Sequence, residues 1–452
     1  MHSSNPVKKT KSKTSIVQKF VDKFKKKKRG KSPSTSTASR EKSAERSKGK
    51  RVSRSNSKSK LSAQSSKNEL AEVTAKAYKK ETKEKKQTKK KESAERSASN
   101  EQSSKVVTLT KSPSLIGLRS AESQMDAFIQ KEKVERGTKC WMEQLEKIDL
   151  KSTLDKEFQQ VERMKVEANK CTAFEKNSDL CQSDNTELLD ANRVKNGDAA
   201  DFFYHGSIIT IPNIPMKVII AQLPLRENPQ SLEAFWLMVA ANKIQRLYVL
   251  FGADEMDKKE QSEYFPEDFV EHTTIRVNSR KVLLRSDDQI NDQLFYEVVP
   301  KDCAEAPFAM IEICDFWHDA KIPTQTARAA ATAASVFESE IDPDATSGVV
   351  SKFGAGRAGS FVVSAAAIEK LRAGEAPNIK DIMVAVRGQR PGAVETFPQY
   401  IFAYVIALTY SLKHVTNPLK AKIEKMIGVL EQFAFEKQTE EDEEDSATTA
   451  ED

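Results

Sequence analysis

Cysteine is scarce in this chain, and the few cysteines form no pattern. There are five in 452 residues, with no Cys-x-x-Cys pair, which argues against a disulfide framework and against a zinc site. A secretory leader is also missing, because Met1 is followed by a long polar and basic stretch. The longest apolar run, around Tyr400 to Leu412, is too short to cross a bilayer. We therefore expect an intracellular protein, cytoplasmic or nuclear, with reduced thiols, no metal and no cofactor.

Acidic residues are rare in the first part of the chain. Residues 1–120 hold 35 Lys/Arg and 10 Asp/Glu, a net charge of about +25, whereas the rest holds 38 and 56, about −18. The first part also has few large apolar residues, too few to offset the entropy of ordering it. We predict a disordered Lys/Ser-rich basic arm over 1–120, one folded domain over 121–438, and a disordered acidic tail over 439–452.

One segment of the basic arm has apolar residues at helical spacing among lysines: Ile16, Val17, Phe20, Val21 and Phe24. It has three interpretations, which the sequence leaves open. It is typical of a basic amphipathic helix on an anionic membrane. It also suits a nuclear localisation patch or a nucleic-acid contact. Finally, it suits a solvated tail whose many serines accept phosphate.

A glycine-rich stretch near residue 355 organises the folded part. Residues 349–361 predict the end of an apolar strand, a glycine-rich loop, and the start of an apolar helix. In this layout, successive backbone N–H groups and a helix N-terminus converge on one point, where they can hold an anion. With Arg357 inside the loop, the stretch predicts a phosphate cradle formed by Lys352, Phe353, Gly354, Ala355, Gly356, Arg357 and Ala358.

The same stretch resembles the signature of the tyrosine-specific protein phosphatases, His-Cys-x-x-Gly-x-Gly-Arg-Ser/Thr-Gly. The glycines and the arginine match at Gly354, Gly356, Arg357 and Gly359. Val350, however, stands at the position of the histidine, and Ser351 at that of the nucleophilic cysteine. A serine hydroxyl is a far weaker acid than a thiol, and neither sequence neighbour is a base. None of the five cysteines has an arginine six positions later, so the sequence offers no substitute nucleophile.

Further segments resemble motifs of that family in the same order along the chain: residues 201–209, 219–225, 234–239, 264–266, 316–323 and 389–400. The resemblance covers roughly residues 121–435. It implies an α/β fold, a protein tyrosine phosphatase-like domain with a highly twisted mixed sheet flanked by helices. The phosphate loop is then expected between a strand and a helix.

The resemblance also assigns roles at the site, and the sequence departs from several of them. Asp319 matches the general acid of the mobile loop, here as a vestige or a loop cap. Glu395 stands where the family has the glutamine that positions the hydrolytic water, while Gln399 is kept. A carboxylate at that position repels a phosphate dianion, unless it pairs with Arg357. Asp179 replaces the tyrosine that forms one wall of the phosphotyrosine pocket.

These departures predict a catalytically degenerate, pseudophosphatase-like member, and most simply not an enzyme. We expect it to act in signalling as a scaffold that binds a protein partner, including a tyrosine-phosphorylated one. Two alternatives remain: residual phosphotyrosine hydrolysis, and anchoring of the chain to a membrane or nucleic acid through the basic arm.

Overall fold

The computed structural model describes residues 113–448 apart from 198, 200, 281–289, 302, 304–305, 319–321, 324 and 339–344. Eight strands form one sheet in the order β1-β2-β8-β3-β7-β6-β5-β4. The strands are β1 Gly206–Ile211, β2 Ile214–Gln222, β3 Ile244–Leu250, β4 Phe269–Glu271, β5 Ile275–Arg280, β6 Asp292–Pro300, β7 Phe308–Cys314 and β8 Thr346–Ser351. The chain was therefore correctly predicted to form an α/β fold with a mixed sheet.

The four central strands β2, β8, β3 and β7 are parallel, and antiparallel strands flank them on both sides. Their residues alternate between two cores. Ile220, Tyr248 and Val349 point into the larger core, whereas their neighbours Ile219 and Val350 point into the smaller one. Central parallel strands that are buried on both faces read as continuous apolar runs in the sequence.

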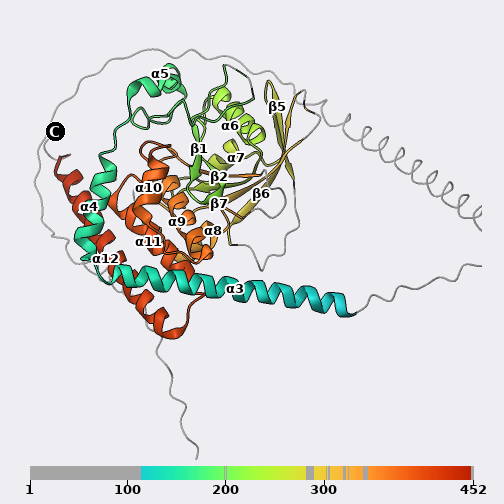
Figure 1. Ribbon diagram of the computed structural model, residues 1–452. Coiled ribbons are helices and arrows are strands. Elements are labelled where there is room, and N and C mark those ends of the chain that lie inside the picture. The colour runs from blue at the N-terminus through green and yellow to red at the C-terminus, as the bar shows by residue number, and fades with distance from the viewer. Residues whose placement is uncertain are drawn as a thin grey trace, which may run out of the picture. The chain divides into compact units, whose positions relative to one another are not determined.

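Helices cover both faces of the sheet (Figure 1). The smaller core packs under α6 Pro229–Ala241 and α7 Lys258–Tyr264. The larger core lies under α3 Pro113–Leu145, α4 Leu150–Glu162, α8 Thr326–Ala333, α9 Gly356–Ala373, α10 Ile379–Arg387, α11 Phe397–Ser411 and α12 Asn417–Thr448. Short helices α5 Thr172–Lys176, η1 Ala168–Lys170 and η2 Ser178–Leu180 precede β1.

Side chains mark where several of these helices begin. Asn228 caps α6 by accepting hydrogen bonds from the amides of Gln230 and Ser231. Thr396 accepts from the amide of Gln399 and caps α11, the buried helix formed by the longest apolar run. Such caps satisfy amides that have no partner within the helix. Among the described residues, no helix is long and apolar enough to cross a membrane.

Helix α3 begins at Pro113. The predicted boundaries between the basic arm, the folded domain and the acidic tail stay a prediction. Helix α12 continues to Thr448. Lys437 and Glu440 pair one turn apart there. The rest of the arm, residues 1–112, lies outside the described residues.

Candidate phosphate-binding site

The loop from Ser351 to Arg357 joins the end of β8 to the start of α9. Gly354 adopts a φ of +63°, and a Cβ there would lie 2.3 Å from the carbonyl carbon of Ala221. Only glycine fits a left-handed conformation with the neighbouring strand so close. The tight turn brings the loop amides and the first turn of α9 together. Amides of a first helical turn have no acceptor within the helix and suit an anion.

The side chain of Arg390 binds the backbone of this loop. Its Nε donates to the carbonyl oxygen of Gly354 at 2.8 Å, and its Nη2 donates to the carbonyl oxygen of Phe353 at 3.1 Å. The side chain is fully buried, and burial lowers the pKa of Arg390 to about 9, which still leaves it charged at neutral pH. The carbonyl groups of Phe353 and Gly354 therefore point toward Arg390, which holds this part of the loop in place.

His205 completes the support and is not available as a base for Ser351. Its Nδ1 lies 2.9 Å from Nη2 of Arg390 and its Nε2 lies 2.8 Å from the carbonyl oxygen of Thr186. A guanidinium can only donate, so Nδ1 accepts and Nε2 carries the proton. Burial and the positive charge of Arg390 hold the pKa of His205 well below its usual range. The His205 imidazole is therefore neutral, and both of its nitrogens already form hydrogen bonds.

Arg357 is the positive group of the cradle, and the rest of the domain holds it in place. Its Nη1 donates to Oε1 and Oε2 of Glu255, at 2.9 and 2.8 Å, and to the carbonyl oxygen of Trp317 at 2.9 Å. The Arg357 side chain is 2% exposed, against 27% for that of Glu255. A buried guanidinium needs such a partner, because an unpaired buried charge is strongly destabilising.

Glu395 and Gln399 cover the first residue of α9. A Cβ at Gly356 would lie 2.6 Å from Oε2 of Glu395 and 2.8 Å from Oε1 of Gln399. The amide of Glu395 donates to Oε1 of Gln399 at 2.9 Å, which fixes the orientation of that side-chain amide. Its Nε2 is then a buried donor with no hydrogen-bond partner among the described residues. Buried donors are rarely left unsatisfied, so this one marks a place for an acceptor.

The segment before Asp319 packs against the loop after β3. The amide of Trp317 donates to the carbonyl oxygen of Phe251 at 3.1 Å, and Nδ1 of His318 lies 2.6 Å from Oδ1 of Asp254. A Cβ at Gly252 would lie 2.4 Å from the His318 ring, so only glycine leaves room for it. Asp319, the predicted vestigial acid, lies outside the described residues.

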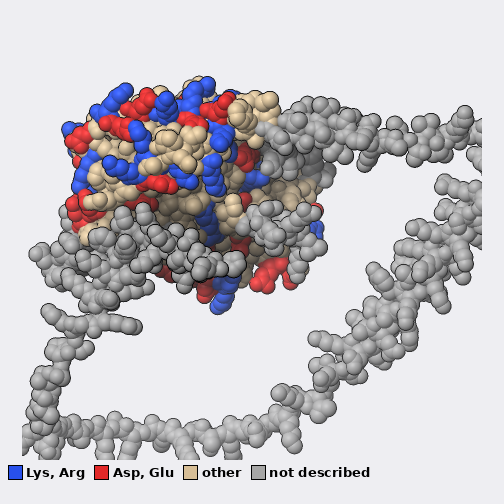
Figure 2. Space-filling view, turned by 90° about the horizontal axis from the view of Figure 1, so that it is seen from below, with Lys and Arg blue, Asp and Glu red and all other residues tan. Residues whose placement is uncertain are grey.

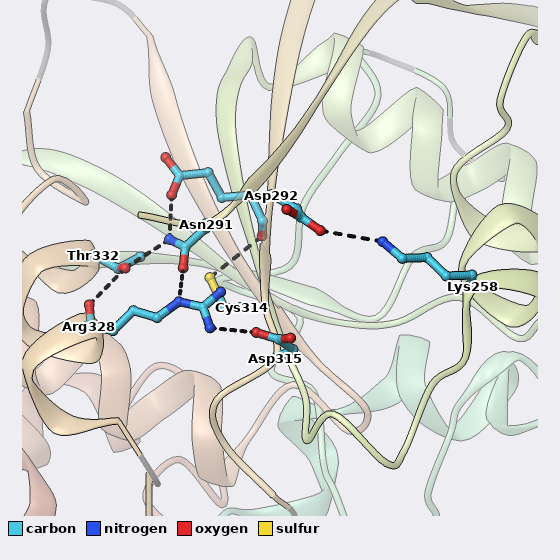
Figure 3. Close-up of polar contacts among 8 residues, drawn as sticks. Lys258, Asn291, Asp292, Cys314, Asp315, Arg328 and Thr332 are labelled. Atoms are coloured by element: carbon cyan, nitrogen blue, oxygen red, sulfur yellow. Dashed lines mark hydrogen bonds and ion pairs between the residues drawn. The ribbon is translucent and has the colours of Figure 1, made fainter. Parts of the chain in front are cut away.

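A polar network holds the start of that segment against α8 (Figure 3). Arg328 on α8 pairs with Asp315 at 2.7 Å and donates from Nε to Oδ1 of Asn291 at 2.8 Å. Asn291 in turn donates to Oγ1 of Thr332 at 2.9 Å. The guanidinium also lies 5.2 Å from the ring centre of Phe316. Asp315 and Asn291, which both precede the segment in the chain, are thus tied to α8.

The described residues include one group with the ligand types of a metal site. Ligand atoms of Asp254, Glu255 and His318 lie within 4.8 Å of one another. Both carboxylate oxygens of Glu255 already accept from Arg357, and His318 is paired with Asp254. The arrangement is balanced by protein charges, and we assign no ion to it.

The structure brings most of the predicted site residues together. Ser351 ends β8 and is 2% exposed, Gly354 to Ala358 are buried, Phe353 is half-buried, and Lys352 is exposed. Gln399 and Glu395 lie against the same loop. The proposed pairing of Glu395 with Arg357 stays a prediction. Asp179, at the position of the pocket wall, is exposed in η2.

The residues that hold the loop could not be identified from the sequence. Glu255 gave no signal, because its pairing with Arg357 spans 102 positions of sequence. Arg390 and His205 fell inside matched segments, but nothing in the sequence indicated that their side chains meet. A buried Arg in an otherwise apolar stretch is a signal that a polar partner exists, although it does not identify it.

Three of the five cysteines are poor candidates for an alternative nucleophile. Burial raises the pKa of Cys171 to about 11 and that of Cys181 to about 12, and it raises that of Cys314 as well. These thiols stay protonated at neutral pH, and a protonated thiol is a poor nucleophile. Cys140 and Cys303 are exposed.

A strand, a glycine-rich loop carrying an arginine, and a helix are the parts of a phosphatase-type phosphate loop, and comparisons with known proteins agree. The protein-tyrosine phosphatase domain matches residues 177–409. A Caenorhabditis elegans protein named as a tyrosine-protein phosphatase is 57% identical over 450 residues, 97% of this chain and 99% of the relative. The chain belongs to the protein-tyrosine phosphatase family.

More distant relatives show how far the likeness extends. Tyrosine-protein phosphatase non-receptor type 2 of Rattus norvegicus is 26% identical over 220 residues, 48% of this chain and 52% of the relative. The crystal structure of the Trypanosoma cruzi protein tyrosine phosphatase TcPTP1 matches with a TM-score of 0.51 at 18% identity, over 62% of this chain and 95% of that one. At that identity the match shows the fold alone.

Proposed function

We propose that this chain is a catalytically inactive member of its family that binds a tyrosine-phosphorylated protein without hydrolysing it, as a scaffold in signalling. The loop shape is kept, while Ser351 occupies the position of the nucleophile. No base is adjacent in sequence, and the buried His205 is neutral and committed to Arg390 and Thr186. A hydroxyl without a base does not attack phosphate at a useful rate.

The proposal that the cradle binds phosphate rests mainly on Gln399, whose side-chain N–H donor has no acceptor among the described residues. Its Nε2 is buried, lacks an acceptor among the described residues, and lies against Gly356 at the start of α9. A phosphate oxygen in the cradle would accept from this donor and from the loop amides. Arg357 would supply the charge, since a guanidinium is well suited to phosphate.

Titration of the full chain with tyrosine-phosphorylated peptides, followed by calorimetry, tests the binding. We expect saturable binding that needs the phosphate and that is lost in Arg357→Ala. Gln399→Met keeps the volume and removes the donor, so we expect weaker binding with the fold intact. Absence of binding to any phosphopeptide would contradict the phosphotyrosine proposal and leave a purely phosphate-independent scaffold.

Phosphate release from the same peptides tests the inactivity. We expect wild type and Ser351→Ala to release phosphate at the same background rate. We also expect Ser351→Cys not to restore strong turnover, because Val350, Ala358 and Glu395 remain. Turnover that Ser351→Ala abolishes would establish the alternative, a residual phosphatase.

A further inference from the structure

Two residues of the loop between β8 and α9 reach solvent. Lys352 is exposed and Phe353 is half-buried. Ser351 before them and the residues from Gly354 to Ala358 after them are all buried. A ligand that enters the cradle from solvent therefore passes the side chains of Lys352 and Phe353, which form the entrance to the cradle.

The aromatic ring of Phe353 lies outside the folded core. It belongs to neither the larger nor the smaller core of the sheet, and it does not pack on the small apolar cluster around Phe174 that precedes β1. Packing of these described clusters therefore does not explain a large apolar side chain at this position. Binding sites are lined mainly by apolar and aromatic side chains, with a few polar groups that fix the orientation of the ligand. A ring at the entrance of the cradle suits this part of a binding site.

The backbone of Phe353 is held in place although its ring is outside the core. Its carbonyl oxygen accepts a hydrogen bond from Nη2 of Arg390 at 3.1 Å, and Arg390 is fully buried. The next residue, Gly354, lies so close to the backbone of β2 that no Cβ fits there. The ring is therefore attached at a fixed point, so a ligand that binds to it loses little free energy in ordering the loop.

Lys352 lies over the same ring, with its Nζ 5.0 Å from the ring centre of Phe353. A cation–π contact at an exposed site is weak. The attraction between an ammonium group and a nearby phosphate dianion is stronger, because the phosphate carries up to two full charges. With a phosphate in the cradle, Lys352 can therefore turn toward it and uncover the face of the Phe353 ring.

We propose that Phe353 makes the cradle selective for a phosphate that is carried by an aromatic ring. The phosphate binds the loop amides and Arg357, and the tyrosyl ring that carries it packs on the ring of Phe353, stacked or edge to face. This inference rests on the proposed function and adds the group that tells phosphotyrosine from other phosphate esters. Arg357 and the loop amides contact only phosphate oxygens, which are the same on phosphoserine and phosphotyrosine, so the discrimination comes from the ring contact.

Calorimetric titration of the full chain with two versions of one peptide, phosphorylated on tyrosine or on serine at the same position, tests this selectivity. We expect wild type to bind the phosphotyrosine version about tenfold more tightly than the phosphoserine version. Phe353→Ala should remove most of that difference by weakening the binding of the phosphotyrosine version. Binding of the phosphoserine version should be unchanged, because the hydrogen bond to Arg390 comes from the backbone of residue 353.

Phe269→Ala is the matched control. Phe269 is an exposed ring that also lies under a cation, with the guanidinium of Arg276 4.9 Å from its centre, but it lies on β4, at the edge of the sheet farther from β8. This variant should keep both affinities. Lys352→Met should weaken both peptides by the same factor, since an ammonium group attracts either phosphate. Thermal unfolding should give Phe353→Ala the midpoint of wild type, because the ring is outside the core.

Three results would overturn this inference. One is tighter binding of the phosphotyrosine version by Phe353→Ala, which would mean that the ring blocks the cradle. Another is a ratio of the two affinities that Phe353→Ala leaves at the wild-type value. The third is equal binding of both versions by wild type. If that equal binding is lost in Arg357→Ala, the cradle binds phosphate as proposed and the selectivity alone is wrong. Absence of binding to both versions would contradict the proposed function and this inference together.

Discussion

Glu395 is the residue at the site whose charge opposes an anion most directly. Its Oε2 lies against Gly356, at the start of the helix whose amides face the cradle. At about 4 Å, two negative charges repel by roughly 1 to 4 kcal/mol, depending on the local dielectric. If the loop binds phosphate as proposed, the Glu395 carboxylate would weaken that binding.

Glu395→Gln should strengthen phosphopeptide binding by roughly tenfold, because it removes that repulsion and keeps the side chain's size. Calorimetric titration of the two proteins with the same peptide measures the change. Glu297→Gln, at an exposed ion pair with Arg280 on the distal strands, serves as the control for a lost carboxylate. Equal or weaker binding by Glu395→Gln would show that the carboxylate does not face the bound phosphate.

His205 makes the stability of the domain depend on pH. Its pKa is depressed in the folded state, so below about pH 6.5 the unfolded chain binds a proton that the folded chain does not. As the pH is lowered from 6.5 toward the pKa of His205 in the folded state, the free energy of unfolding should fall by about 1.4 kcal/mol for each pH unit. Above pH 7 this contribution should be constant.

Denaturant unfolding between pH 5 and pH 8 measures that slope, with His205→Gln as the comparison. Burial also depresses the pKa of His272 and His414, but both are present in the two proteins and cancel in the difference. If the free energy of unfolding depends on pH in the same way in wild type and in His205→Gln, then His205 is protonated in the folded state as readily as in the unfolded chain, and the prediction is wrong.

At the scale of elements, the turn from β8 into α9 depends on one glycine. Gly354 has a φ of +63°, and a Cβ there would lie 2.3 Å from the carbonyl carbon and 2.4 Å from the carbonyl oxygen of Ala221. The contact is with the backbone of β2, which is fixed in the sheet by β8 and β1. The clash cannot be relieved by a side-chain rotation.

Gly354→Ala should therefore cost more than about 3 kcal/mol in the free energy of unfolding. Gly428→Ala is the matched control, since nothing lies within 4 Å of a Cβ at that position in α12. It should stabilise the domain by roughly 1 kcal/mol through helix propensity. Chemical denaturation of both variants gives the comparison, and a Gly354→Ala protein as stable as wild type would show that the loop can adopt another conformation.

The sequence predicted the elements better than the contacts between them. Buried parallel strands such as β3 and the glycine loop before α9 have strong local signals, since both depend on residues adjacent in the chain. The partner of Arg357 could not be predicted, because any of several acidic residues could have reached it. Composition alone does not fix where α3 begins or where α12 ends, because Glu, Lys and Gln are good helix formers and are also common in disordered segments.

At the scale of the whole molecule, charge divides the chain. The first 120 residues carry about +25 and the rest about −18. On the face of the domain shown in Figure 2, by contrast, basic and acidic side chains are interspersed. A part of the chain with a net charge of about −18 repels anionic partners, so any attraction to them should come from the basic arm.

The full chain should bind anionic vesicles or nucleic acid, and the binding should weaken steeply with added salt. A chain that begins at Leu109, where the second unit of the protein starts, should not bind either partner. Co-sedimentation at a series of salt concentrations measures both. If the full chain and the chain that begins at Leu109 co-sediment with the anionic partner to the same extent, the anion-binding surface lies on the domain instead.

Ser351 also changes how the site responds to oxidation. Peroxide oxidises thiolates, so a phosphate loop built around a reactive cysteine is inactivated by it. In this chain the loop contains no sulfur, and the raised pKa values of Cys171, Cys181 and Cys314 leave those thiols unreactive. Cys140 and Cys303 are exposed, Cys181 is half-buried, and Cys171 and Cys314 are buried. The phosphate loop should therefore be unchanged under oxidative conditions that inactivate a loop built around a reactive cysteine.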